Sequence, residues 1–361
     1  MAGSCGAGGS PTNPNPGGGE SKPRTDETIL GWASSSISSI SADEQALGAK
    51  NGMLSTYVDF VNSPGFPTAY ADAAAQRSAP LLIAWEPWDW NGDSLDQPEF
   101  RSSDLAAGSY DSYMIEWLKE AERQSAKAPI LVRFAPEMND AVRPWSVGAN
   151  GGNTAADYIA MWRHVYELKE QHAPSVDLMW NPLVDGSDPA GNPVAISAAF
   201  PGESYVDMVA LDGFNWGDVQ NPAQCGWQSY EDIFKAPVAE LKRLAPSKPW
   251  GIAETASLSM DESVFQEGGK CYDGWGSWVY QWPESGAYYK TADDWITQAG
   301  WTKTMIQQAN RDGAMFVNIF NVQKETDWRL QSTPAGQQVI GTAKASNPVK
   351  TGEDGTAGYF R

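Results

Sequence analysis

Eight short apolar segments alternate with helical patterns along this chain, and this alternation restricts the fold more than any other feature of the sequence. The segments have the length of β-strands and lie at residues 29–34, 57–61, 81–85, 130–134, 176–180, 206–211, 249–253 and 314–320. Helical patterns occupy residues 43–50, 69–76, 110–126, 233–244, 294–311 and 337–345, and a further helix starts at Thr154 and ends before Pro174. Eight strands alternating with helices within one domain's length predict an α/β protein with a single (β/α)8 TIM barrel. An open doubly wound sheet is the alternative, but it would normally carry a Gly-rich phosphate loop after its first strand, and none follows residues 29–34.

The two ends of the chain differ in composition from the part between them. Residues 1–26 are rich in Gly, Pro, Ser and Asn, which predicts a flexible linker, and residues 346–361 form a polar tail. We therefore expect the barrel domain to span residues 27–345. Cys5 follows three small residues and resembles the mature end of a bacterial lipoprotein, which implies a lipid tether, with a plain secreted linker as the alternative. No stretch approaches the ~20 apolar residues of a transmembrane helix.

The charge and the aromatic content indicate the kind of ligand. The formal net charge of −20 repels nucleic acids and anionic membranes, so we expect neither as a partner. It suits a monomeric, extracellular or cell-surface protein that binds a neutral substrate. The 17 Trp residues are a large excess, and each needs a hydrogen-bond partner for its indole N–H inside a core. The excess therefore indicates an aromatic-lined cleft, for which flat sugar faces are a common ligand, although part of it would serve only to fill the core.

Few residues are available for metal or His-based chemistry. The chain has two His, both in helical patterns, and neither Cys225 nor Cys271 has neighbours at metal-ligand spacing. We therefore expect no cofactor and no metal ion. Cys225 and Cys271 both lie in loop-like segments, so a disulfide between them is expected in an oxidising compartment, with two free thiols as the alternative.

Polar and aromatic side chains follow nearly every predicted strand. Parallel strands of a barrel place such residues on one face, where barrel enzymes keep their active sites. Residues 130–134 lead to Glu137, and residues 249–253 lead to Glu254. Glu86 is a rival carboxylate that is either structural or a substrate contact. The candidate substrate-binding residues are Trp88, Trp90, Arg133, Asn139, Trp145, Trp180, Asn181, Asp212, Phe214, Asn215 and Trp216, together with Trp275 and Trp282 from a Trp-rich segment.

Two glutamates among Trp, Asn and Asp side chains are typical of a glycosidase, in which one carboxyl is the general acid and the other the nucleophile. The fourth and seventh strands lie on opposite sides of a barrel, so Glu137 and Glu254 can face each other, and a separation of roughly 5–5.5 Å would predict a retaining mechanism. Glu254 directly follows a buried segment and suits the ionised nucleophile. Glu137 is closer to solvent and suits the acid/base, with a pKa raised by burial or by nearby negative charge. Arg133 points the same way as Glu137 along its strand and would support the negative charge of a neighbouring carboxylate.

Several motifs resemble those of glycoside hydrolase family 26, and the resemblance covers about residues 30–320. The strongest are RFAPEMND at residues 133–140, the Pro-Trp pair at 144–145, the Tyr158, Trp162, Arg163 and Val165 helix, the strand at 176–182, VDMVALDGFNWG at 206–217 and PWGIAETAS at 249–257. The resemblance implies Glu137 as acid/base and Glu254 as nucleophile. It also implies an endo-acting, retaining β-glycanase, most often one that cleaves β-1,4-mannan.

Two positions depart from the pattern of the family. Many members carry His immediately before the acid/base, where this chain has Pro136, and Tyr at the end of the sixth strand, where it has Phe214. Both changes remove polar groups that tune the glutamates. Mixed-linkage β-glucan and β-1,3-xylan are therefore alternatives to β-1,4-mannan as the polysaccharide substrate, and a non-catalytic glycan-binding protein is the alternative from another functional class.

Overall fold

The structure of the chain, a computed structural model, describes residues 27–216, 228–258, 270–272, 278–281, 298–346 and 349–360. For residues 270–272 and 278–281 it describes the backbone only. Cys5, Cys225, Trp275 and Trp282 lie outside these ranges, and the side chain of Cys271 is likewise outside the description. The disulfide, the lipid tether and the contacts of these two Trp residues therefore stay predictions.

Eight parallel strands form the barrel. In chain order they are β1 (Thr28–Trp32), β2 (Leu54–Asp59), β3 (Leu81–Glu86), β4 (Ile130–Phe134), β5 (Asp177–Trp180), β8 (Met208–Asn215), β9 (Trp250–Ser257) and β12 (Phe316–Ile319). Their order in the sheet is β1-β12-β9-β8-β5-β4-β3-β2, so the strands follow one another round the barrel as they do along the chain. The two ends of this order meet where the N–H of Gly52 donates a hydrogen bond of 3.1 Å to the carbonyl of Leu30. The predicted (β/α)8 barrel is confirmed.

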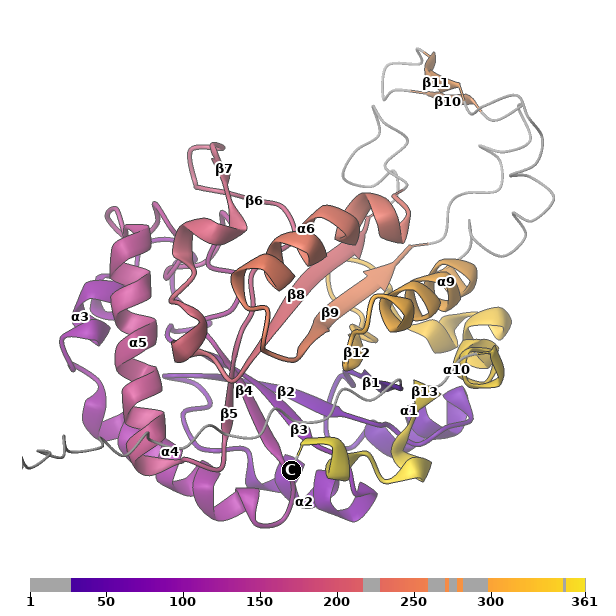
Figure 1. Cartoon of the computed structure of the whole chain (residues 1–361), viewed down its shortest axis with the longest axis horizontal. Helices are drawn as coiled ribbons and strands as arrows, with labels where there is room; N and C mark the ends of the chain where they lie inside the picture. Colours follow the sequence, from indigo (N-terminus) through magenta and orange to yellow (C-terminus); the bar gives the residue numbers. More distant parts are fainter. Residues whose placement is uncertain are drawn as a thin grey trace, which may run out of the picture.

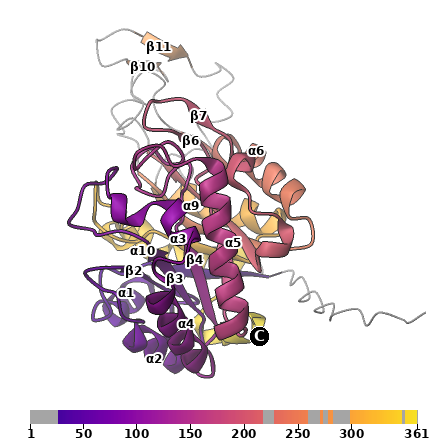
Figure 2. The same cartoon turned by 90° about the vertical axis from the view of Figure 1, so that its left-hand side faces the viewer.

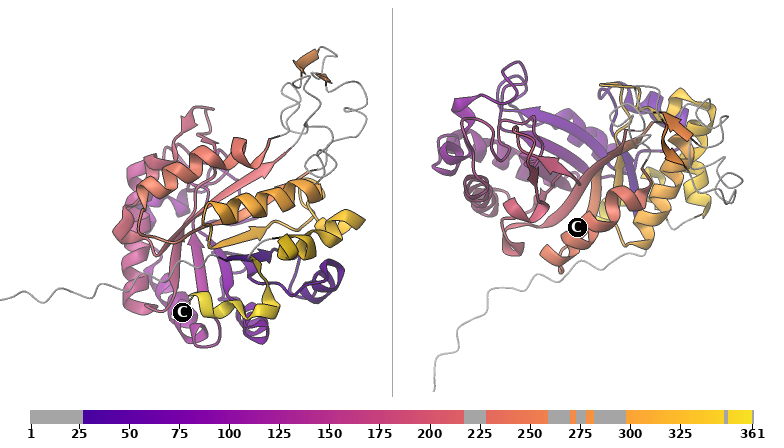
Figure 3. Two further views of the ribbon diagram at one scale, coloured as in Figure 1. Left: turned by 45° about the vertical axis from the view of Figure 1, so that its right-hand side comes forward. Right: turned by 90° about the horizontal axis from the view of Figure 1, so that it is seen from above.

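Helices cover the outside of the barrel (Figure 1). The α-helices are α1 (Ile40–Leu47), α2 (Thr68–Arg77), α3 (Ser102–Ala106), α4 (Asp111–Ser125), α5 (Ala155–His172), α6 (Tyr230–Leu244), α9 (Gln298–Arg311) and α10 (Pro334–Ser346). Short 3-10 helices occur at η1 (Pro98–Phe100), η2 (Ile196–Ala199), η3 (Glu203–Tyr205), η5 (Leu330–Ser332), η6 (Gly352–Asp354) and η7 (Thr356–Phe360). Two short antiparallel pairs are β6 (Gly186–Ser187) with β7 (Pro193–Val194) and β10 (Lys270–Tyr272) with β11 (Trp278–Gln281). Figure 2 shows α5 along the outer side of the barrel, and Figure 3 shows the arrangement from two further sides. Among the described residues, no helix combines the length and the apolar character needed to cross a bilayer.

The helix α5 begins where the sequence predicts it. Thr154 accepts a hydrogen bond of 3.1 Å from the N–H of Asp157, and the carboxylate of Asp157 accepts one of 2.9 Å from the N–H of Thr154. This capping box satisfies two N–H groups that a helix start leaves without partners. The helix packs its buried face, which includes Met161 and Val165, against the barrel core.

The C-terminal tail differs from the sequence-based expectation. The strand β13 (Val349–Lys350) pairs in parallel with β1, and the following residues pack across the amino-terminal end of the barrel. Phe360 is 4% exposed and packs against Phe316 inside the barrel. The C-terminus lies close to α2 (Figure 1), where Ala357 N–H donates to the carbonyl of Ser78 at 2.7 Å. A polar composition concealed these few buried contacts, which hold the tail in place.

Candidate active site

The active-site face begins where the apolar filling of the barrel ends. The interior is filled by the side chains of Ile29, Met53, Leu82, Leu131, Met179, Met208, Ala210, Ala253, Phe316 and Phe360. Arg133 lies two residues after Leu131 on β4, and Asp212 lies two residues after Ala210 on β8. Side chains along a strand alternate between its faces, so both polar residues point into the barrel, as their apolar predecessors do. The result is a polar layer directly above the core.

Glu254 enters this layer through a β-bulge in β9. Leu211 of β8 pairs with Ile252, but the next residue, Asp212, pairs with Glu254, so Ala253 is an extra residue on β9. Ala253 already points into the barrel, and simple alternation would turn Glu254 away from it. The bulge removes that alternation and directs Glu254 to the cleft, as bulges beside active sites commonly do.

Glu137 leaves β4 on a turn with left-handed backbone at two non-glycine residues. The φ angle is 41° at Ala135 and 54° at Glu137. Such conformations cost of the order of ~1–3 kcal/mol each and persist where the surroundings hold them. The contacts that hold this turn are hydrogen bonds from Tyr158 Oη to Ala135 O (2.9 Å), from Trp145 Nε1 to Pro136 O (2.7 Å) and from Glu137 N to Asn181 O (2.7 Å). The turn therefore aims the Glu137 side chain into the cleft.

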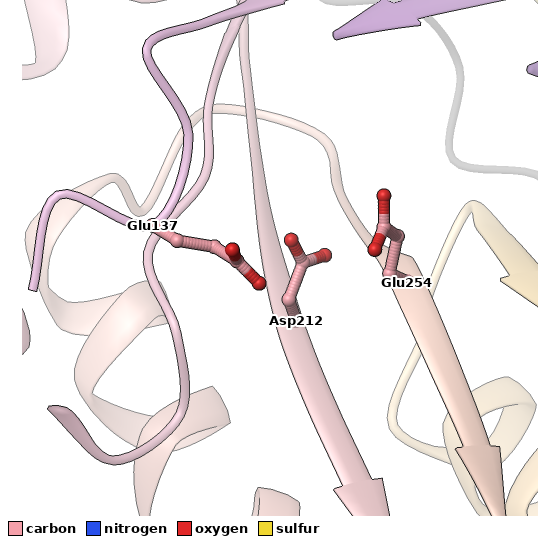
Figure 4. Close-up of side chains that lie close together, drawn as sticks. All are labelled: Glu137, Asp212 and Glu254. Carbon is pink, nitrogen blue, oxygen red and sulfur yellow. The ribbon is translucent and has the colours of Figure 1, made fainter. Parts of the chain in front are cut away.

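Glu137, Asp212 and Glu254 form a cluster of three buried carboxyl groups. One carboxylate oxygen of each residue lies within 4.8 Å of one carboxylate oxygen of each of the other two. Figure 4 shows Asp212 between the two glutamates, with the carboxyl group of Glu137 pointing toward it. Grouped carboxylates are also what a metal ion binds, but Arg133 already binds two of these three. We therefore interpret the cluster as one of reacting carboxyl groups.

Arg133 connects two members of the cluster, Asp212 and Glu254. Its Nη1 donates to Asp212 Oδ2 at 2.7 Å and to Asn181 Oδ1 at 2.8 Å, and its Nη2 donates to Glu254 Oε1. Burial alone would lower the pKa of Arg133, but Asp212 and the other carboxylates raise it, so the guanidinium stays charged. Arg133 thus orients two acids with one planar group, which a lysine could not do.

Tyr57 of β2 is a site residue that the sequence-based analysis missed. Its hydroxyl donates a hydrogen bond of 2.6 Å to Glu254 Oε1, the same oxygen that Arg133 contacts. The described hydrogen bonds to Glu254 therefore converge on Oε1 and leave Oε2 without one. Phe214, which has no hydroxyl, packs instead against Phe320 and Trp328. The hydroxyl that β8 lacks is thus supplied by β2.

Arg143 forms an ion pair with Glu137 and favours its ionised form. Its Nη2 lies 2.7 Å from Glu137 Oε2, and its guanidinium lies 5.7 Å from the centre of the Trp88 ring. Burial would raise the pKa of Glu137, but Arg143 and, less strongly, Arg133 lower it below its ordinary value. The raised pKa that the sequence-based analysis expected for an acid/base is therefore wrong for this state of the site. No sequence pattern marks Arg143, since it lies in an irregular loop.

Asp212 has the opposite shift. Burial raises its pKa to about 7, against the lowering effect of Arg133. Its side chain has no exposed surface, and Oδ1 has no hydrogen-bond partner among the described residues. An unpartnered buried carboxyl oxygen favours the protonated form.

The cluster opens into a cleft of about 610 Å³. Trp88 and Trp90 line it, and both indole N–H groups donate to Glu86 Oε2, at 3.0 and 2.7 Å. Trp90 is 39% exposed, so its ring is available to a ligand. The remaining lining includes Tyr70, Pro136, Phe320 and Lys324. Glu86 thus fixes the two Trp rings and itself lines the cleft.

Several predicted substrate-binding residues lie outside the cleft lining. Trp145 and Trp180 have no exposed surface and belong to the apolar core, so neither ring can stack on a sugar here. Trp145 instead holds the Glu137 turn. The side chain of Asn139 is buried against the backbone of Leu183, and that of Asn215 donates to Ser257 at 2.9 Å.

Two further predicted residues are only partly buried. Phe214 and Trp216 belong to an aromatic cluster with Phe320 and Trp328 beside the cleft. Asn181 and Asp212 act through Arg133 rather than from the cleft wall. The structure thus brings together Trp88, Trp90, Arg133, Asn181, Asp212 and the two glutamates from the predicted set.

A parallel barrel with paired buried glutamates at the carboxyl ends of its strands and a Trp-lined cleft is the arrangement of a barrel glycoside hydrolase. A family model described as "Glycosyl hydrolase family 26" matches residues 30–323. The chain belongs to glycosyl hydrolase family 26 and is a glycoside hydrolase.

Similar proteins agree with this assignment. The chain is 27% identical over 320 residues to endoglucanase H of Acetivibrio thermocellus, a match that covers 87% of this chain and 30% of that protein's length. Among solved structures, the Bacteroides ovatus β-mannanase BoMan26A is similar with a TM-score of 0.59 and 14% identity over 93% of each chain. The GH26A protein from Muricauda sp. MAR_2010_75 has a TM-score of 0.55 and 16% identity over 91% of this chain and 92% of its own. These structural matches show a shared fold.

Proposed function

We propose that this glycoside hydrolase is a retaining endo-β-glycanase in which Glu254 is the nucleophile and Glu137 the acid/base. The observation that carries the proposal is the closeness of the two glutamates, whose nearest oxygens lie within 4.8 Å. Carboxyl groups roughly 5–5.5 Å apart suit direct attack on the sugar, whereas inverting enzymes need about 6.5–9.5 Å to admit a water molecule. The spacing therefore supports double displacement.

The environments of the two glutamates support the division of roles. Glu254 receives hydrogen bonds from Tyr57 and Arg133 on Oε1, which keep it ionised and leave Oε2 to attack the anomeric carbon. Glu137 sits on the turn after β4, beside Arg143, and lines the cleft in which a leaving oxygen would be protonated. In the second step Glu137 would activate the water that releases the sugar from Glu254.

The first candidate substrate is β-1,4-mannan, and the second is a β-glucan. Mannan follows from the family and from neighbours whose names include mannanases, although those neighbours share little sequence with this chain. The β-glucan candidate rests on the relative named endoglucanase H, which matches 87% of this chain. Because that match covers only 30% of the relative's length, we carry the relative's named activity over to this chain only as a proposal.

The test is hydrolysis of a panel of soluble mannans, mixed-linkage and β-1,4-glucans, β-1,3-xylan and galactans by the full chain. We expect internal cleavage of one of these, with the β-anomer as the first product by NMR. Glu254→Gln should lower the rate by at least about 10⁴-fold. Rescue of Glu254→Ala by azide with formation of an α-glycosyl azide would identify the nucleophile directly. Wild-type cleavage with the α-anomer released first, or full activity of Glu254→Gln, would contradict the mechanism.

We also propose an extracellular or cell-surface location. It is supported by the net charge of −20 and by the Gly-, Pro- and Ser-rich residues 1–26. Localisation of the natural protein by cell fractionation, compared with a Cys5→Ser variant, would test both the location and the lipid tether.

A further inference from the structure

Asp212 is a buried carboxyl group that the two-glutamate mechanism does not use. It has no exposed surface, one oxygen is bound by Arg133, and Oδ1 has no partner among the described residues. Figure 4 shows it between Glu137 and Glu254. An oxygen of Asp212 lies within 4.8 Å of an oxygen of each glutamate, and one water molecule with two ordinary hydrogen bonds spans such a distance.

The charges around Asp212 favour one proton in the cluster. Glu137, Asp212 and Glu254 would carry three negative charges, whereas Arg133 and Arg143 carry two positive charges. Glu86 and Lys324 line the same cleft and add one charge of each sign, while Tyr57 and Asn181 face the cluster as neutral groups. Asp140 is a further carboxyl group, 3.8 Å from Arg143, so Arg143 is not available to Glu137 alone. Uncompensated negative charge is costly in a buried site, so a proton shared by the carboxyl groups is favoured.

The position of that proton follows from the contacts. Glu254 is bound by Arg133 and Tyr57, and Glu137 is bound by Arg143, so both glutamates are stabilised as anions. Asp212 shares Arg133 with Glu254 and keeps one oxygen without a partner. Burial raises the pKa of Asp212 to about 7, whereas Arg143 lowers that of Glu137, which agrees with this distribution.

We propose that Asp212 stores the proton in the free enzyme and supplies it to Glu137, which donates it to the leaving group. This inference rests on the proposed function and assigns Asp212 a positioning role, because it acts through Glu137 rather than on the sugar. It explains how an acid/base that Arg143 holds ionised can still act as an acid.

The steps balance in protons. Asp212 gives its proton to a bridging water as that water gives one to Glu137, so Asp212 becomes the anion and Glu137 the acid. Glu137 then protonates the leaving oxygen while the C1–O bond breaks and Glu254 Oε2 bonds to C1. In the second step water attacks C1, Glu137 takes its proton, Glu254 leaves as the carboxylate, and the proton on Glu137 returns to Asp212.

Arg133 couples the proton transfer to the chemistry. While Glu254 is ionised, it competes with Asp212 for the guanidinium. Once Glu254 becomes an ester, Arg133 has only the anion of Asp212 to neutralise, so Asp212 is stabilised as the anion for as long as the ester lasts. Release of Glu254 reverses the competition and returns the proton to Asp212.

Infrared difference spectroscopy of the full chain tests where the proton resides. The spectra are recorded at about pH 6, below the pKa of about 7 of Asp212. Two difference spectra are calculated in the region of the neutral carboxyl C=O stretch: wild type minus Asp212→Asn, and wild type minus Glu137→Gln. We expect a neutral-carboxyl band in the Asp212→Asn difference spectrum and none in the Glu137→Gln spectrum. Other protonated carboxyls cancel because both proteins contain them.

A band in the Glu137→Gln spectrum would overturn the proposal, and so would the absence of a band in a correctly folded Asp212→Asn protein. If Asp212→Asn does not fold, the Glu137→Gln spectrum alone still decides, since a band there places the proton on Glu137. Kinetics give a second readout: Asp212→Asn should lose about 100-fold more activity on a natural glycan than on a dinitrophenyl glycoside, whose leaving group needs no proton. The spectra need no turnover, so their outcome is separate from failure of the proposed function, which would appear as absence of hydrolysis by wild type.

Discussion

Tyr57 and Glu254 lie 197 positions apart in the chain, and the Tyr57 hydroxyl donates a hydrogen bond of 2.6 Å to Glu254 Oε1. The contact connects β2 to β9 across the inside of the barrel. With Arg133 on the same oxygen, it restrains the carboxylate and leaves Oε2 without a described hydrogen bond. Phe214 at the end of β8 has no hydroxyl and packs against Phe320, so the hydroxyl on Glu254 comes from β2 and not from β8.

Tyr57→Phe should therefore lower kcat with little change in KM. A hydrogen bond to a charged group contributes about 1.5–3 kcal/mol, which corresponds to roughly a 10–100-fold change in rate. Tyr70→Phe is the matched control, because Tyr70 lines the same cleft. Steady-state kinetics on the best glycan of the panel provide the measurement. A loss of less than about twofold for Tyr57→Phe would mean that Arg133 alone orients the nucleophile.

Arg143→Gln should move the alkaline limb of the kcat/KM profile to higher pH. Arg143 lowers the pKa of Glu137, so its removal makes the carboxyl cluster keep its proton at higher pH, and activity that requires the protonated acid extends upward. An opposite charge at this distance shifts a carboxyl pKa by about 1–3 units, so a displacement of about one pH unit or more is expected. Because the three carboxyls interact, the limb reports the whole cluster.

Lys324→Gln is the control for this experiment. Lys324 also lowers the pKa of Glu137, but less than Arg143 and Arg133 do, and it lies on the exposed edge of the cleft. Its profile should move in the same direction by less. A downward displacement for Arg143→Gln, or an equal one for both variants, would show that the ion pair with Arg143 does not control the acid.

The fold was predictable because its signals are local. Runs such as ILVRF at residues 130–134 are apolar enough to be recognised one segment at a time, and the Thr154 capping box needs only four residues. Glu254 was recognisable because it follows such a run directly, and Glu137 because it comes three residues after the end of one. The sequence pattern predicts strand β2 three residues late, since Ser55 and Thr56 are polar although both are buried.

The rest of the site depends on register and packing between distant segments. Simple alternation along β9 would not direct Glu254 inward. The bulge at Ala253 does so, and it could not be predicted from the sequence because it is visible only in the pairing of β9 with β8. Trp145 and Trp180 follow strands as cleft residues would, but the turn after β4 and the packing against Phe200 bury them. The ion pair between Arg143 and Glu137 joins two loop residues whose geometry no local pattern determines.

Phe360→Ala should destabilise the barrel without changing the site. Phe360 is buried against Phe316, which fills the amino-terminal end of the barrel, away from the carboxyl cluster. Replacing a buried Phe with Ala costs about 3–5 kcal/mol, which urea unfolding followed by Trp fluorescence will measure. Tyr359→Phe is the control, since it removes only the hydrogen bond to Glu27. Equal stability of Phe360→Ala and wild type would mean that the tail does not contribute to the fold.

Glu86→Leu should weaken the binding of long substrates while leaving the chemistry on short ones intact. Glu86 Oε2 accepts both indole N–H groups, and Trp90 depends on it more than Trp88, whose ring also packs edge-on against Trp145. Loss of about 1.5 kcal/mol of orientation should raise KM for polysaccharide roughly tenfold and leave kcat/KM for a short aryl glycoside within about twofold. Trp90→Ala should give the same split if Glu86 acts by holding that ring. In the Trp90→Ala background the further effect of Glu86→Leu should then be small, because the two residues work through one contact. Additive effects of the two substitutions would instead indicate that Glu86 contacts the substrate itself, which was one of the two roles its sequence position allowed.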